Sequence, residues 1–229
     1  MQHQKILILD FGSQVTQLIA RRVREAHVYC EVHPCDVSSD WVREYAKDGN
    51  LKGVILSGSH ASVYEVDDKA PDAVYELGVP VLGICYGMQL IAHGLGGKVE
   101  RSAAREYGPG QLQGDPKCAL FDKLPAKLEV WNSHGDKITK FPAGFRPLGK
   151  TENSPHAVIG DTKRHIYGLQ FHPEVVHTPR GKEILANFVH RICGCKSNWT
   201  MESFIDRTCR EIREQVGDGR VILGLSGGV

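Results

Sequence analysis

The segment VPVLGICYGMQLIAHGLGG (79–97) joins two patterns whose order decides the fold. Its first part, VPVLGI (79–84), is a short and nearly continuous apolar run, which is typical of a strand buried on both faces of a sheet. Its second part, MQLIAHGLGG (88–97), reads as a helix that ends at two glycines. The segment therefore predicts a buried strand that turns sharply into a helix at Cys85-Tyr86-Gly87.

Similar apolar runs occur on both sides of this segment. They predict strands at KILILD (5–10), HVYCEVH (27–33), GVIL (53–56) and IYGLQFHPEV (166–175). Helical patterns separate them, and we expect Ser13 and Thr178 to cap two of these helices at their N-termini. The fold class predicted is α/β, an open and mostly parallel sheet with helices on both faces. Between about residues 98 and 167, short segments broken by Pro and Gly predict a small antiparallel region.

Composition excludes several classes of function. Lys and Arg number 28 and Asp and Glu 27, so no basic excess favours nucleic acid as a partner. No apolar stretch approaches the roughly 18 residues of a membrane span. The seven cysteines are an odd number in a chain too large to need disulfides, which predicts reduced thiols and a cytoplasmic location. His27, Cys30, His33 and Cys35 resemble a zinc set, but alternation along a strand places Cys30 and His33 on opposite faces, so we expect no metal site.

The C-terminal segment reads as the opening of a second domain. A helix is expected at 200–216, a glycine turn at 217–219 and a buried strand at RVILGL (220–225). We therefore expect residues 1–195 to form one domain and 196–229 a linker with the truncated start of another, poorly packed because its strand lacks a sheet. Ser226, Gly227 and Gly228 would suit a phosphate loop but lack the following helix.

Cys85 is the first candidate catalytic residue. A cysteine held between a buried strand and a helix, with Gly83 and Gly87 beside it, matches a nucleophile elbow, and the helix N-terminus favours a thiolate. The backbone N–H of Tyr86 would then point to a developing oxyanion. A buried structural cysteine is the competing interpretation.

His172-Pro173-Glu174 supplies the remaining groups of a triad. Pro173 favours an extended His172, and residues two apart on a strand share a face, so Glu174 can orient the imidazole. An exposed pair without a role is the alternative. The turn Ser57-Gly58-Ser59-His60 follows another strand, and the C-termini of parallel strands meet at one crevice. Gly58 could therefore offer a second oxyanion N–H, although a plain glycine turn has the same sequence.

Three motifs together resemble the class I glutamine amidotransferases: GICYGMQ (83–89), GLQFHPE (168–174) and the glycine turn at 57–59. The resemblance spans nearly all of residues 1–195 and implies a flavodoxin-like fold. DFGSQ (10–14), ARRVRE (20–25), WNSHGDK (131–137) and the C-terminal segment are similar to the bacterial members that form GMP, in which an ATP-pyrophosphatase domain follows.

The resemblance implies roles for the candidates. Cys85 would attack the side-chain amide of L-glutamine, His172 would move the proton, Glu174 would orient His172, and the N–H groups of Gly58 and Tyr86 would form the oxyanion hole. Gln89, with the segment Ser133, His134 and Gly135, would hold the amino-acid end of glutamine. The glutaminase domain would need no cofactor, whereas the full-length enzyme would use ATP and Mg²⁺ to aminate adenylylated XMP and would be a homodimer with a further dimerisation domain.

One motif departs from the family. Its turn is usually Ser-Gly-Gly-Pro, whereas this chain has Ser57-Gly58-Ser59-His60. Serine reaches positive φ less easily than glycine, so we expect Ser59→Gly to change basal activity. Two other functions remain open: another thiol hydrolase of the same fold, such as a peptidase or γ-glutamyl hydrolase, and a non-catalytic binding or regulatory module.

Overall fold

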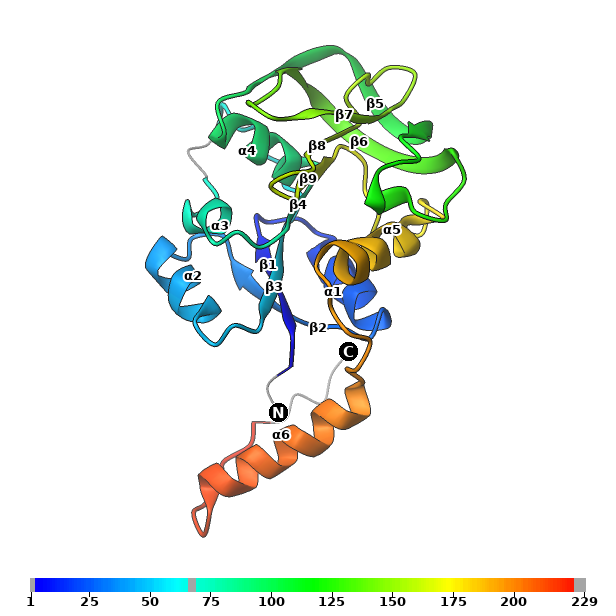
Figure 1. Ribbon diagram of the computed structural model, residues 1–229. Helices are drawn as coiled ribbons and strands as arrows, with labels where there is room; N and C mark the ends of the chain where they lie inside the picture. Colours follow the sequence, from blue (N-terminus) through cyan, green and yellow to red (C-terminus); the bar gives the residue numbers. More distant parts are fainter. Residues whose placement is uncertain (1–2, 66–68, 225–229) are drawn as a thin grey trace.

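A single sheet of nine strands organises the part of the chain that the computed structural model describes, residues 3–65 and 69–224 (Figure 1). Its order is β2-β1-β3-β4-β9-β8-β7-β5-β6. The strands are β1 (Lys5–Asp10), β2 (Tyr29–Pro34), β3 (Leu51–Leu56), β4 (Val81–Ile84), β5 (Lys98–Gly114), β6 (Lys127–Lys140), β7 (Arg146–Lys150), β8 (Val158–Asp161) and β9 (Ile166–Leu169). The helices are α1 (Thr16–Glu25), α2 (Ser39–Ala46), α3 (Ala73–Glu76), α4 (Tyr86–Gly94), α5 (Gly181–Asn187) and α6 (Met201–Val216), with short helical turns η1 (Ala119–Phe121) and η2 (Phe188–Ile192).

The sheet is mixed, and its parallel part comes first. Strands β2, β1, β3, β4 and β9 pair in parallel. Strands β8, β7, β5 and β6 continue the same sheet with antiparallel pairing. This arrangement confirms the predicted fold class, and the antiparallel strands fall within the stretch of about 98–167 where the Pro- and Gly-broken pattern placed them.

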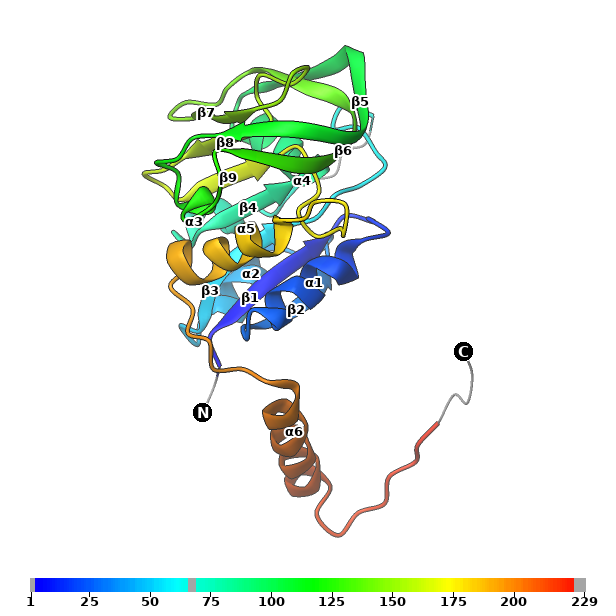
Figure 2. The same cartoon turned by 90° about the vertical axis from the view of Figure 1, so that its right-hand side faces the viewer.

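Helices cover both faces of the parallel strands (Figures 1 and 2). In β1, Ile6 and Ile8 pack into the core beneath α1 and α5, whereas Leu7 and Leu9 face the core beneath α2, α3 and α4. All four side chains have no exposed surface. Successive side chains of a strand point to opposite faces, so a strand covered on both sides must be apolar throughout.

Helix α1 begins later than its sequence suggested. The expected N-cap Ser13 is not the cap, because α1 starts at Thr16 and its N-cap residue is Val15 without a side-chain hydrogen bond. The Ser13 hydroxyl instead accepts from the amide of Val15 at 3.3 Å, within the preceding turn. The Thr16 hydroxyl donates to Asp10 Oδ1 at 2.7 Å, which fixes the β1–α1 connection by a different contact.

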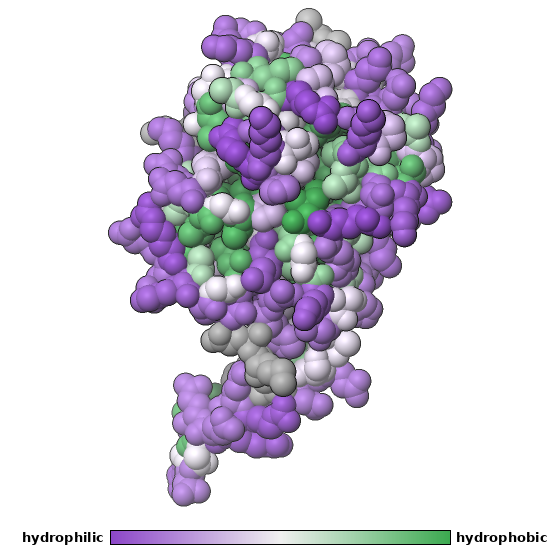
Figure 3. Space-filling view, in the orientation of Figure 1, coloured by the Kyte–Doolittle hydropathy of each residue, from purple (hydrophilic) through white to green (hydrophobic). Residues whose placement is uncertain are grey.

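Helix α6 projects away from the sheet (Figures 1 and 2), and the surface it shows in Figure 3 is mostly hydrophilic. Thr200 caps it, as its hydroxyl accepts from the Ser203 amide at 3.2 Å. Before the cap, Trp199 is buried against Tyr29 and donates its amide to the carbonyl of His27 at 3.0 Å. The linker is therefore anchored on the β2 edge of the sheet.

The strand expected at 220–225 is wrong over its described part. Residues 220–224 pair with none of the nine strands, and Ile222 is 98% exposed. Apolar, β-branched residues favour a strand only where neighbouring strands accept their backbone hydrogen bonds, and none lies beside this run within the described residues. Ser226, Gly227 and Gly228 lie outside the described residues.

Two further observations concern the whole fold. All seven cysteines lie within the described residues, and none of them forms a disulfide there. Among residues 3–65 and 69–224, no helix has the length and apolar character needed to cross a membrane.

Candidate active site

Cys85 occupies the sharp turn between β4 and α4. Its backbone has φ +53° and ψ −106°, a conformation that non-glycine residues rarely adopt and that tends to persist at functional sites. Its amide donates to the carbonyl of Leu169 on β9 at 2.7 Å, and its own carbonyl accepts from Met88 at 3.1 Å inside α4. The turn is thus tied to both the sheet and the helix.

Two glycines make this turn possible. A Cβ on Gly83 would lie 2.4 Å from the backbone of Gly87, and a Cβ on Gly87 would lie 2.3 Å from the carbonyl oxygen of Leu56. Both distances are far below any real carbon contact. The helix can therefore start directly above β3 and β4 only because neither residue has a side chain, which gives the glycine pattern around Cys85 a steric cause.

His172 lies on a loop rather than on a strand. The sequence suggested a strand over 166–175, but β9 ends at Leu169. The loop is instead held by specific contacts. The His172 amide donates to the carbonyl of Trp131 at 3.0 Å, and the Thr178 hydroxyl donates to the carbonyl of His172 at 2.6 Å while accepting from the Trp131 amide at 3.0 Å.

Thr178 therefore does not cap a helix, contrary to the sequence-based expectation. Helix α5 begins at Gly181, its N-cap residue is Arg180, and Thr178 uses its hydroxyl to join the His172 loop to β6. A Cβ on Gly181 would lie 1.8 Å from the carbonyl oxygen of Pro173, so the helix start packs directly on this loop. The same residue type serves either role, and long-range contacts decide between them.

Glu174 is fully buried behind the ring of His172, although neither residue is in a strand. His172 Nδ1 and Glu174 Oε1 are 2.8 Å apart. Glu174 Oε2 has no hydrogen-bond partner among the described residues. A buried carboxylate with one unpaired oxygen is costly unless a cation faces it, so the geometry favours a protonated imidazole.

The pKa of His172 reflects this environment. Burial of the ring lowers the pKa, but hydrogen bonds to Cys85 and Glu174 and the attraction of their negative charges outweigh it and raise the pKa to about 10. His172 therefore carries its proton at neutral pH, with one nitrogen committed to Glu174.

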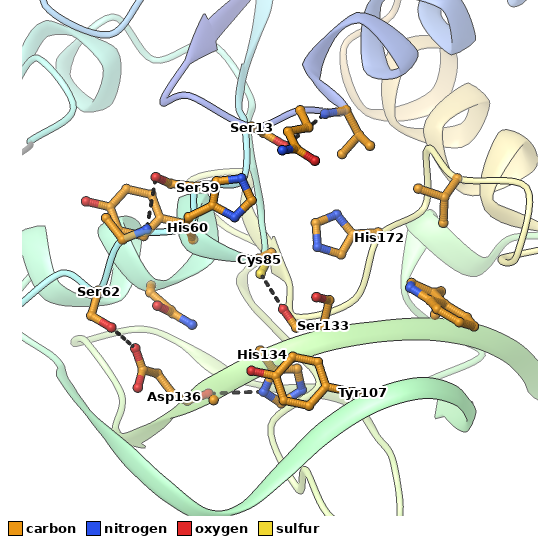
Figure 4. A pocket seen from close by; sticks show the side chains of 18 of the residues that line it. Ser13, Ser59, His60, Ser62, Cys85, Tyr107, Ser133, His134, Asp136 and His172 are labelled. Atoms are coloured by element: carbon orange, nitrogen blue, oxygen red, sulfur yellow. Dashed lines mark hydrogen bonds between the residues drawn. The ribbon is translucent and has the colours of Figure 1, made fainter.

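The side chains of Cys85 and His172 point into one pocket of about 440 Å³ (Figure 4). Cys85 Sγ lies 3.6 Å from the carbonyl oxygen of Ser133 and 4.0 Å from Gln170 Nε2. The other expected substrate-binding residues, Gln89, His134 and Gly135, also line the pocket.

The expected oxyanion donors lie beside these groups. Tyr86, the first residue of α4, lines the pocket. A Cβ on Gly58 would lie 3.3 Å from His172 Cε1, so the turn after β3 approaches the imidazole closely. Ser57 braces this turn, since its hydroxyl accepts from the Phe11 amide and donates to the Gly58 carbonyl, both at 2.9 Å. Ser59 does not have positive φ, so the turn as built does not require glycine there.

Asp136, which lines this pocket, was not among the residues predicted from the sequence. Asp136 accepts hydrogen bonds from Ser62 at 2.7 Å and Tyr64 at 2.6 Å, which ties the loop after Gly58 to β6. Asp136 stood within the motif WNSHGDK, but its partners are distant in sequence and no local pattern identified them. Among the described residues, no three His, Cys, Asp or Glu side chains converge as they would around a metal ion.

Comparisons with known proteins show which family this chain resembles. The family model for glutamine amidotransferase class-I matches residues 7–192. The chain is 60% identical to the GMP synthase [glutamine-hydrolyzing] of Albidiferax ferrireducens and 58% identical to that of Azoarcus sp., over 99% and 100% of this chain. It spans 44% and 45% of the length of these two relatives.

Solved structures show the same relationship. A candidate GMP synthase component from Thermoplasma acidophilum aligns with a TM-score of 0.72 and 30% identity, covering 93% of this chain and 99% of that one. A glutamine amidotransferase of Thermotoga maritima aligns with a TM-score of 0.64 at 18% identity, over 84% of this chain and 99% of its own, a likeness of fold alone. The elbow, the pocket and the matched sequence together place this chain in the class I glutamine amidotransferase family.

Proposed function

We propose that this chain hydrolyses L-glutamine to L-glutamate and ammonia, with Cys85 as the nucleophile, His172 as the acid and base and Glu174 as the residue that orients His172. The observation that carries the proposal is the convergence of an elbow cysteine and a Glu-paired imidazole in one pocket. This is the nucleophile, base and orienter arrangement of covalent amide hydrolysis.

The reaction proceeds in two halves. The Cys85 sulfur, as thiolate, attacks the side-chain amide carbon and forms a tetrahedral oxyanion, which the N–H groups of Gly58 and Tyr86 would stabilise. His172 gives its proton to the amide nitrogen, and the C–N bond breaks. Ammonia departs, and the acyl group remains bound to Cys85 as a thioester. His172 then takes a proton from water, which attacks the thioester and releases glutamate as the C–S bond breaks.

In the pocket, Gln89 and the segment 133–135 would hold the amino-acid end of the substrate. These residues line the side of the pocket where the Ser133 carbonyl lies 3.6 Å from Cys85 Sγ. A glutamine lying along this side would present its side-chain amide to the sulfur. No cofactor takes part in these steps.

We further propose that residues 1–195 are the glutaminase part of a GMP synthase and that 196–229 are a linker and the start of its ATP-pyrophosphatase part. The length of the relatives and the exposed segment 220–224 support this division. In the whole enzyme, ATP and Mg²⁺ would activate XMP, and the ammonia would aminate it to GMP, giving AMP and pyrophosphate. Such an enzyme would be cytoplasmic and homodimeric.

The test is glutamate release from L-glutamine by the 229-residue chain and by Cys85→Ala. We expect release that the substitution abolishes. A peptidase or γ-glutamyl hydrolase would instead cleave peptides or γ-glutamyl peptides faster than glutamine. A binding module would release no ammonia from either chain, and that result would overturn the proposal.

A further inference from the structure

Three buried polar side chains lie beneath the wall formed by residues 133–135. The antiparallel register of β5 and β6 places Glu106 directly opposite His134, and Thr151 follows β7 beside them. The side chains of His134 and Glu106 are only 3% and 8% exposed. Buried polar groups are costly unless every one is hydrogen-bonded, so their partners determine what this cluster can do.

Both ring nitrogens of His134 are engaged inside the protein. Nδ1 lies 3.2 Å from the carbonyl oxygen of Asp136, and Nε2 lies 3.0 Å from Glu106 Oε2. A carbonyl oxygen can only accept, so Nδ1 must carry a proton. The second bond needs a proton as well, on either the ring or the carboxyl group. His134 and Glu106 thus form a pair that holds one shared proton between them.

The far oxygen of Glu106 is also satisfied. The Thr151 hydroxyl donates to Oε1 at 2.9 Å and accepts from the Ser154 amide at 3.1 Å. An unbroken chain of hydrogen bonds therefore runs from the backbone at 154 to the backbone at 136. Fully satisfied buried networks hold a single arrangement, whereas a gap in one leaves a buried group unpaired.

The surroundings of His134 disfavour a positive charge on its ring. Burial lowers the pKa of His134, even though the charge and hydrogen bond of Glu106 act in the opposite direction, and the positive charge on His172 lowers it further. With both nitrogens engaged, the His134 ring has none left for a ligand. The His134 ring therefore contributes to the pocket by holding the backbone of residues 133–135 in place.

We propose that Glu106 is a positioning residue, which through its hydrogen bonds to His134 and Thr151 fixes the 133–135 wall against which glutamine lies. This inference rests on the proposed function. The wall matters because the Ser133 carbonyl lies 3.6 Å from Cys85 Sγ, so displacement of the segment alters where the substrate amide meets the sulfur.

Two substitutions of Glu106 separate positioning from charge. In Glu106→Gln the amide oxygen accepts from Thr151 and the amide nitrogen donates to His134 Nε2, so the network survives. In Glu106→Leu both partners lose their bond. We expect KM for glutamine to change less than about twofold in Glu106→Gln and to rise about tenfold or more in Glu106→Leu, with a smaller change in kcat.

Thr151→Val provides a milder break if Glu106→Leu fails to fold, and we expect it to raise KM by about threefold. Unchanged KM in both Glu106→Leu and Thr151→Val, or equal impairment in Glu106→Gln and Glu106→Leu, would overturn the inference. Absence of glutamate release by the unsubstituted chain would instead contradict the proposed function.

A second measurement requires no turnover. Nitrogen-15 NMR of histidine-labelled protein, with the His134 resonances assigned by Thr151→Val and Glu106→Gln perturbation, reports which ring nitrogens carry protons. We expect a protonated Nδ1 in the unsubstituted chain and in Glu106→Gln, with Nε2 unprotonated in the latter. An unprotonated Nδ1 in the unsubstituted chain would refute the shared-proton pair whether or not glutamine is hydrolysed.

Discussion

Glu174→Gln should move the alkaline limit of glutamine hydrolysis to lower pH. Glu174 has no exposed surface and lies 2.8 Å from His172 Nδ1. Glutamine has nearly the same shape, and its side-chain oxygen can still accept from the Nδ1–H group. The substitution therefore removes the negative charge while it leaves the ring in place, so it separates the electrostatic role of the carboxylate from its orienting role.

The size of the effect follows from the pKa of His172, which the structure raises from 6.5 to about 10. That rise corresponds to about 5 kcal/mol of preference for the protonated ring. Cys85 and Glu174 both contribute to it. If Glu174 supplies about half, the pKa falls by about two units to roughly 8 in the variant. The protonated fraction at pH 9 then drops about tenfold, whereas at pH 7 it changes little.

The assay is the initial rate of glutamate release at saturating glutamine between pH 6.5 and 10.5. In the proposed reaction His172 gives a proton to the leaving ammonia, so the rate should fall above about pH 8 in Glu174→Gln and only near pH 10 in the unsubstituted chain. Glu183→Gln is the matched control, because Glu183 lies on α5 and pairs with Arg180 at the surface. Superimposable pH profiles for Glu174→Gln and the unsubstituted chain would refute the reasoning.

Four further predictions test single features. Gly87→Ala should destabilise the fold by about 3 kcal/mol or more in denaturant unfolding, because its Cβ has no room, whereas Gly94→Ala in the same helix should be neutral or stabilising; equal stabilities would contradict the steric argument. Thr178→Val should lower kcat about tenfold, because the His172 loop loses its hydrogen bond to the hydroxyl, whereas Thr178→Ser should keep kcat near that of the unsubstituted chain. A low kcat in Thr178→Ser would exclude the hydroxyl as the cause. Ser59→Gly should change basal glutaminase activity by loosening the turn, and identical rates would reject that role. Finally, the pKa of His172 is about 10 in the folded chain and 6.5 in the unfolded chain, so the protonated ring stabilises the folded chain fully below pH 6.5, and this contribution is lost as the pH rises through about 10. The free energy of unfolding measured in urea should therefore fall across this range, and a free energy that does not change with pH would contradict the prediction.

The parallel strands and the elbow could be predicted because local sequence determines them. The sequence KILILD predicts strand β1 correctly, because Ile6 and Leu7 are buried on opposite faces of the sheet and both must be apolar. The sequence also predicts the elbow correctly. A side chain on Gly83 would collide with Gly87, close in sequence, and a side chain on Gly87 would collide with Leu56 of the adjacent strand.

The helix caps and the C-terminal strand could not be predicted, because distant partners decide them. Ser13 and Thr178 have the side chains of N-caps, yet Ser13 lies in a turn and Thr178 joins the His172 loop to β6. The run RVILGL has strand composition without neighbouring strands among the described residues. Glu106 was missed for the same reason, since only the register of β5 with β6 brings it to His134.

The site itself depends on sheet register more than on local sequence. Strands β4 and β9 are neighbours in parallel, and Ile84 pairs with Leu169. Cys85 follows the first strand at once, while His172 follows the second after a short loop that Trp131 and Thr178 hold in place. A shift of one residue in this pairing would move the Cys85 turn along the sheet relative to the His172 loop, by about the 3.3 Å rise of one strand residue. The amide of Cys85, bonded to the Leu169 carbonyl at 2.7 Å, is the contact that locks the register at the point where the chemistry would begin.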